Sequence, residues 1–130
     1  MSNDPLLLVV GISGLALLVL TTMIHYEALR GLSAALPRLP VAPRSKLIVV
    51  ILVSFAAHCV EIALYAGAYH LLVNVLGDGL MGGPAPAPLS RLLYFSAETY
   101  TSLGYGDVVP HGPVRMLAGT EALNGLLLIG

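Results

Sequence analysis

Two long apolar runs decide what this chain can fold into. Residues 5–24 are uncharged and mostly apolar, and residues 47–77 form a second run in which Glu61 is the one charged residue. A helix of about 20 residues is about 30 Å long and crosses a membrane, whereas 31 residues reach about 46 Å and must tilt or project. Since 57% of the residues are hydrophobic and 10% charged, we expect an all-α integral membrane protein.

The first run is expected to be a retained transmembrane helix, residues 1–25, and not a cleaved secretory signal. A signal peptide needs a basic segment before its apolar part. The residues before Pro5, MSND, contain no lysine or arginine. This interpretation gives the chain a spanning helix ahead of everything that follows.

Residues 26–46 set the orientation. They contain three prolines and four of the six Lys and Arg residues of the chain, so we expect a loop, which a helical extension through Leu36 can precede. Because basic loops stay in the cytoplasm, the N-terminus should lie outside. Residues 78–89, rich in glycine and proline, are then an outer loop in which we expect neither helix nor strand.

A short helix and a distinctive motif follow the outer loop. Residues 90–101 can form a helix of about 18 Å, too short to span a membrane but suited to a re-entrant segment. The helix runs into Thr-Ser-Leu-Gly-Tyr-Gly-Asp at residues 101–107. Residues 115–130 begin a last apolar helix that stops short of a full span, which suggests a truncated chain.

The motif resembles the selectivity filter of potassium channels, whose usual pattern is T-x-G-Y-G-D. Residues 47–130 resemble the pore domain of that family, divided into outer helix 47–77, outer loop 78–89, pore helix 90–101, filter 102–107 and inner helix 115–130. The basic loop independently puts the motif at the outer face, where these channels carry their filter. The resemblance implies a homotetramer around one pore, with three transmembrane helices per chain and residues 1–25 packed outside the pore.

The resemblance also implies how the motif works. In this family, backbone carbonyl groups replace the water around K⁺, so the ion would be held by Ser102, Leu103, Gly104, Tyr105 and Gly106. The two glycines would supply backbone angles that other residues resist, and the side chains of Leu103 and Tyr105 would pack against the supporting helix. Ser102 and Leu103 replace the usual threonine and valine, so a weakly selective monovalent cation channel is the alternative.

Five residues around the motif are candidates for filter support. Glu98 lies where several relatives place a glutamate paired with the aspartate that follows the filter, here Asp107. Tyr94 and Phe95 occupy the place of an aromatic cuff, and Thr101 directly precedes the filter. The resemblance implies that these residues hold the filter in shape.

The last helix offers three more candidates. Gly125 is either a hinge or a close packing contact between helices, as small residues often are in membranes. Glu121 and Asn124 are three residues apart. They either face a cavity below the filter, where a carboxylate would concentrate cations, or brace the pore helix from behind.

A second group of polar residues lies within the apolar runs. His58 and Glu61 are three apart and share one helix face, and His25 is expected at the cytoplasmic end of the first span. Ionisable residues inside a membrane indicate function by default. Three interpretations stay open: a hydrogen-bonded pair that pins the first helix against the second, a proton-linked role, and a metal site, for which these three residues are weak candidates. The matching alternative function is a non-conducting protein that senses metal or pH.

Other function classes find no support in the sequence. A net charge of −1 gives no basic surface for nucleic acid. No catalytic or phosphate-binding motif is present, so we expect neither an enzyme nor a small-molecule substrate, and no cofactor apart from K⁺ as the permeant ion. The short chain with a minimal pore is typical of a prokaryotic cytoplasmic membrane, where lipids would be its other partners.

Overall fold

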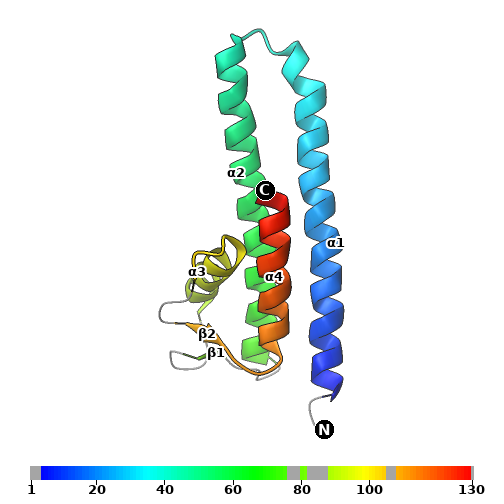
Figure 1. Ribbon diagram of the computed structural model, residues 1–130, viewed down its shortest axis with the longest axis vertical. Helices are drawn as coiled ribbons and strands as arrows, with labels where there is room; N and C mark the ends of the chain where they lie inside the picture. Colours follow the sequence, from blue (N-terminus) through cyan, green and yellow to red (C-terminus); the bar gives the residue numbers. More distant parts are fainter. Residues whose placement is uncertain (1–3, 76–79, 82–87, 105–107, 130) are drawn as a thin grey trace.

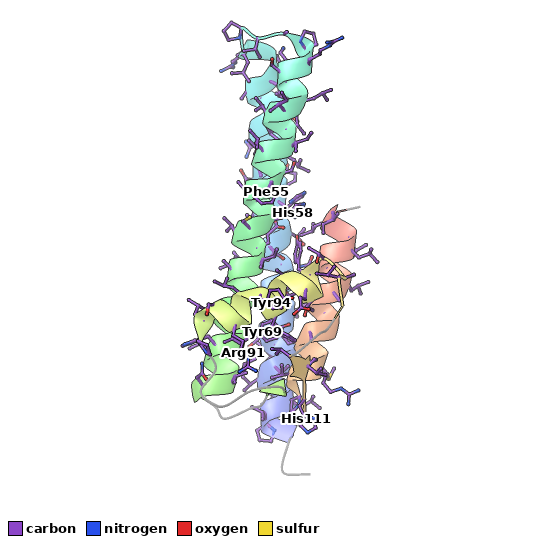
Figure 2. The ribbon with its side chains drawn as sticks, turned by 90° about the vertical axis from the view of Figure 1, so that its left-hand side faces the viewer. Phe55, His58, Tyr69, Arg91, Tyr94 and His111 are labelled. Carbon is purple, nitrogen blue, oxygen red and sulfur yellow. The ribbon has the colours of Figure 1, made fainter. Side chains whose placement is uncertain are left out.

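Two long helices form the frame of the molecule in the computed structural model, which describes residues 4–75, 80–81, 88–104 and 108–129. Helices α1 (Asp4–Ala35) and α2 (Pro43–His70) run antiparallel, side by side (Figure 1). The stretches Pro5–Arg38 and Pro43–Asn74 are each long and apolar enough to cross a membrane. Apolar side chains such as Leu8, Phe55 and Ile51 are largely exposed on them (Figure 2). This confirms a mostly helical chain with two helices that suit a membrane.

The first part of residues 26–46 is the helical extension through Leu36 that the sequence allowed, and the loop that remains is shorter than predicted. Helix α1 continues to Ala35 and a 3-10 turn, Leu36–Arg38, follows it, while α2 already begins at Pro43. Polar residues appear after Ile24, but polarity does not break a helix. Glu27 and Arg30 even form an exposed i,i+3 ion pair of 3.5 Å. Pro43 stands in the first turn of α2, where the missing N–H costs nothing.

A small β-ladder joins the two segments that flank the short helix. After a π-helical turn, Leu71–Val75, the chain reaches β1 (Leu80–Met81), which pairs antiparallel with β2 (Val109–Pro110). Leu80 lies opposite Pro110 and Met81 opposite Val109. The expectation that residues 78–89 contain no strand is therefore wrong at β1. Leu-Met is an apolar pair inside a glycine- and proline-rich segment, and average composition conceals such a pair.

The two shorter helices complete the bundle. Helix α3 (Leu89–Tyr100) packs against α2 and α4, and α4 (Val114–Ile129) packs against α1 and α3 (Figure 1). Their bounds differ by one residue from the predicted ranges. The core lies where the four helices meet, and its largest buried side chains are Tyr65, Tyr69, Tyr100, Phe95, Leu92 and Leu117.

The segments expected to lie on the same side of the membrane lie at the same end of the molecule. The start of α1 lies at the same end of the molecule as β1 and β2, and the connection between α1 and α2 lies at the opposite end (Figure 1). Helix α4 starts near β2 and runs back along α1 (Figure 1). The N-terminal end of α1 and the segments flanking α3 therefore belong to one face.

Candidate functional site

The chain leaves α3 through a backbone turn that its last helical residues hold in place. The N–H groups of Thr101, Ser102 and Leu103 donate to the carbonyl oxygens of Ala97, Thr99 and Glu98 at 3.1, 3.2 and 3.0 Å. The turn is thus tied to the C-terminal end of α3, whose carbonyl groups carry the negative end of the helix dipole.

Two alternate residues of this turn have positive φ angles. Ser102 has φ 61° and Gly104 has φ 104°. A Cβ atom at Gly104 would meet no atom of the described residues within 4 Å, and the positive backbone angle is by itself a reason for glycine there. The left-handed serine was not foreseen, since no sequence signal marks it. Tyr105, Gly106 and Asp107 lie outside the described residues.

The side chains of the turn point away from the core of the chain. Leu103 is 75% exposed on the protomer, so its packing against a supporting helix is not seen within one chain and stays a prediction. Ser102 is also exposed. The hydroxyl of Thr101 donates back to the carbonyl oxygen of Ala97 at 2.6 Å, which ties this residue to α3.

The candidates for filter support divide into buried and exposed residues. Phe95 is buried and packs edge-on against Tyr69 with ring centroids 5.0 Å apart, whereas Tyr94 is 54% exposed on α3 (Figure 2). Glu98 is buried, and its Oε1 has no hydrogen-bond partner among the described residues. A buried carboxylate oxygen is costly to leave unpaired. Its predicted partner, Asp107, lies outside those residues, so the pairing stays a prediction.

Glu121 does not face a cavity, as one of the two sequence interpretations had it. Its side chain is fully buried within the protomer. Oε2 accepts a hydrogen bond from the Tyr69 hydroxyl at 2.6 Å, and Oε1 accepts one from the Ser96 hydroxyl at 2.5 Å. Glu121 therefore links α4 to α2 and α3, which is the bracing role that the other interpretation gave it.

Asn124 is likewise turned into the protein, and the cavity interpretation is wrong for it as well. It is 1% exposed, and its Nδ2 donates to the Thr21 hydroxyl oxygen at 2.6 Å and to the Tyr65 hydroxyl oxygen at 2.8 Å. These contacts reach α1 and α2, not α3. The two polar residues of α4 together fasten this helix to the other three.

Gly125 lies where α4 meets the end of α3. A Cβ atom added at this position would overlap the backbone carbonyl oxygen of Tyr100. The structure therefore gives Gly125 a packing role that needs no hinge, because only a residue without a side chain allows the two backbones to approach so closely. The hinge role is not tested by this arrangement.

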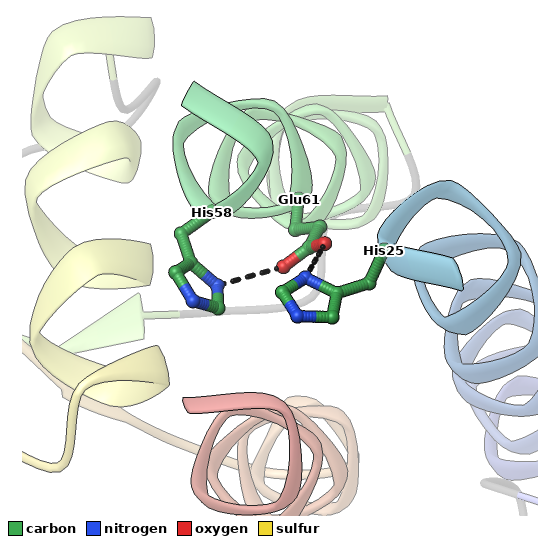
Figure 3. A group of neighbouring side chains, drawn as sticks. All are labelled: His25, His58 and Glu61. Atoms are coloured by element: carbon green, nitrogen blue, oxygen red, sulfur yellow. Dashed lines mark hydrogen bonds and ion pairs between the residues drawn. The ribbon is translucent and has the colours of Figure 1, made fainter. Parts of the chain in front are cut away.

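His25, His58 and Glu61 converge at the contact between α1 and α2 (Figure 3). The Nδ1 atom of His25 lies 3.0 Å from Glu61 Oε1, and the Nδ1 atom of His58 lies 3.0 Å from Glu61 Oε2. The imidazole rings stack with centroids 4.9 Å apart. Helix α1 continues for ten residues beyond His25, and the position of His25 at the cytoplasmic end of the membrane span stays a prediction.

Tyr100 joins this cluster from α3 and was missed by the sequence reasoning. Its hydroxyl donates to Glu61 Oε2, and its oxygen lies 2.9 Å from His58 Nδ1. Tyr100 is 39 residues from Glu61 in the chain, so no local spacing could indicate the contact. The cluster thus touches the last residue of α3, directly before the turn at Thr101–Gly104.

Comparison with known proteins identifies relatives of the second part of the chain. The family model described as "Ion channel" matches residues 47–130. The voltage-gated potassium channel regulatory subunits KCNG1 of Homo sapiens, Mus musculus and Rattus norvegicus are each 32% identical over 72 residues. That alignment covers 55% of this chain and 13% of each relative, so the chain matches a small part of their length. No solved structure matches the chain.

Proposed function

The chain belongs to the potassium channel pore family of ion channels, and from this premise we propose that it passes K⁺ selectively down its electrochemical gradient. The main support for this proposal is the turn that follows α3, where Ser102 and Gly104 have φ angles of 61° and 104°. Alternate residues with such angles can turn successive carbonyl groups towards one axis. Carbonyl oxygens on one axis can replace the water of a potassium ion.

The proposed filter runs from Ser102 to Gly106. Its carbonyl groups would bind K⁺, the negative C-terminal end of α3 would favour a cation beneath them, and Glu98 with Asp107 would brace them. The buried and unpaired Oε1 of Glu98 supports a partner beyond the described residues. We propose no cofactor and no enzymatic role.

One chain supplies one quarter of such a pore, so we propose a homotetramer. Leu103, Tyr94 and Leu127 are 75%, 54% and 67% exposed on the protomer and are available for contacts with neighbouring chains. Each chain would contribute three transmembrane helices, α1, α2 and α4, with α3 re-entrant and α1 outside the pore. The N-terminus would be external and the basic connection of α1 to α2 cytoplasmic, in a prokaryotic membrane.

The assembly can be tested without measuring current. The purified protein should contain four chains by native mass spectrometry, and its thermal dissociation midpoint should be higher in K⁺ than in Na⁺ at equal ionic strength. A ligand that binds the assembled state stabilises it by mass action. A complex of another size, or equal midpoints in the two ions, would contradict the proposed filter.

A weakly selective cation channel is the second candidate, and the exposed Leu103 and the serine at position 102 favour it. Ser102→Gly tests the selective channel, because glycine tolerates the positive φ and removes the hydroxymethyl group together with its hydroxyl. If this hydroxyl serves the innermost ion site, the K⁺ over Na⁺ permeability ratio should fall about 2- to 10-fold, the equivalent of one polar contact. An unchanged K⁺ over Na⁺ permeability ratio in bi-ionic recordings would show that the hydroxyl does not serve the ion site.

A further inference from the structure

The proposed conduction path does not use the cluster of His25, His58 and Glu61, which lies at the contact of α1 with α2 (Figure 3). The atoms that these residues can offer to a metal all lie within 4.8 Å of one another. We propose that the cluster binds one divalent transition-metal ion of the zinc class per chain. The inference does not rest on ion conduction.

The spacing of the ligand atoms suits such an ion. Zinc binds imidazole nitrogen and carboxylate oxygen at about 2.0–2.2 Å, which separates the ligands of a tetrahedral site by roughly 3.3–3.6 Å. Each imidazole Nδ1 lies 3.0 Å from a Glu61 oxygen. An ion would need shifts of a few tenths of an ångström at these pairs, and ligand atoms as far apart as 4.8 Å would approach by roughly 1.2–1.5 Å through side-chain rotation. Two histidines and one glutamate are a known zinc ligand set.

The charge of the cluster also favours a cation. Glu61 is 0% exposed, and within the part of the chain that the structure describes no lysine or arginine contacts its carboxylate. Its partners there are two imidazoles and a phenol. A buried carboxylate without a cation is expensive in a membrane. A bound metal ion would supply the missing charge.

Tyr100 would complete the site and connect it to α3. Its hydroxyl contacts both Glu61 and His58, so it can orient the carboxylate as an outer partner, as hydrogen-bonded groups around metal ligands do. The side chains of His25 and His58 keep 11% and 20% of their surface exposed, which leaves a way in for the ion. Metal at this place would clamp α1, α2 and the end of α3 together.

Equilibrium Zn²⁺ binding to the full chain in lipid nanodiscs tests the proposal. After treatment with a chelator, the wild-type protein should take up one Zn²⁺ per chain in calorimetry and metal analysis. His25→Gln and His58→Gln should each weaken binding at least 10-fold. His111→Gln is the matched control, since His111 is exposed near β2, far from His58 (Figure 2), and it should bind as the wild type does.

The proposal is overturned if the wild-type chain takes up no more Zn²⁺ than His25→Gln, or if the His111→Gln variant loses as much. If the cluster variants fail to assemble, the visible absorption of Co²⁺ bound to the wild-type chain tests the site instead. The intense visible absorption of tetrahedral Co²⁺ is expected, and the weak absorption of octahedral Co²⁺ alone would refute the site. Neither measurement uses ionic current. Both therefore test the metal site even if the protein does not conduct ions.

Discussion

Replacing Gly104 with alanine should abolish K⁺ conduction. Gly104 has φ 104°, an angle that costs a residue with a side chain about 1–3 kcal/mol. In a tetramer the cost would be roughly 4–12 kcal/mol over four chains, enough to change the backbone of the proposed filter. Among the described residues no atom lies within 4 Å of the added methyl group, so overlap with that part of the protomer does not explain the loss. K⁺ flux from liposomes measures the effect, with an expected decrease of more than 100-fold.

Gly112→Ala is the matched control for Gly104→Ala. Gly112 also has a positive φ, 66°, but it lies just before α4 and outside the proposed filter. Alanine should cost about 1–2 kcal/mol there and lower the thermal stability modestly while K⁺ flux persists. If Gly112→Ala silences the protein as completely as Gly104→Ala does, the loss reflects backbone strain in general and the role of Gly104 in the filter is refuted.

Replacing Gly125 with alanine should destabilise the protein and reduce conduction. The added Cβ overlaps the backbone carbonyl oxygen of Tyr100, which cannot rotate away as a side chain could. Overpacking costs typically about 1–3 kcal/mol. Relief requires α4 and the end of α3 to separate, which would also shift Tyr100 from Glu61. Thermal unfolding followed by circular dichroism should show a lower midpoint, and K⁺ flux should decrease with it.

Two other glycine variants separate this collision from a general effect of losing glycine. Among the described residues, an added Cβ at Gly119 in α4 or at Gly31 in α1 meets no atom within 4 Å outside the backbone of its own helix. Alanine at either position should leave the midpoint unchanged or raise it, because a helical glycine is less stable than alanine by roughly 0.5–1 kcal/mol. A midpoint for Gly125→Ala equal to those of the two controls would mean that the close approach to Tyr100 does not exist.

The sequence predicted those parts of the fold that depend on composition and local pattern. Two apolar runs of sufficient length became α1 and α2, and the short helix before the motif became α3 within one residue. Family membership was indicated by the residues at 101–107, and the match over residues 47–130 confirmed it. These features can be predicted without knowing which residues are in contact in the folded chain.

Helix ends and buried contacts were harder, for physical reasons. The change from apolar to polar residues after Ile24 marks where a membrane could end, but the hydrogen bonds of α1 continue to Ala35. The role of Glu121 could not be decided because its partners, Tyr69 and Ser96, are 52 and 25 residues away. Hydropathy and motif spacing contain no information on contacts at that separation, and the contact of Tyr100 with Glu61 was missed for the same reason.

Selective K⁺ conduction can be measured as ion flux from liposomes that hold the purified wild-type protein. Separate vesicles carry outward gradients of K⁺ or Na⁺ at equal ionic strength, and empty vesicles serve as the blank. For a K⁺-selective channel we expect K⁺ efflux well above the blank, with Na⁺ efflux close to it. Equal efflux of the two ions would contradict K⁺ selectivity, and no efflux of either from correctly assembled protein would contradict conduction itself.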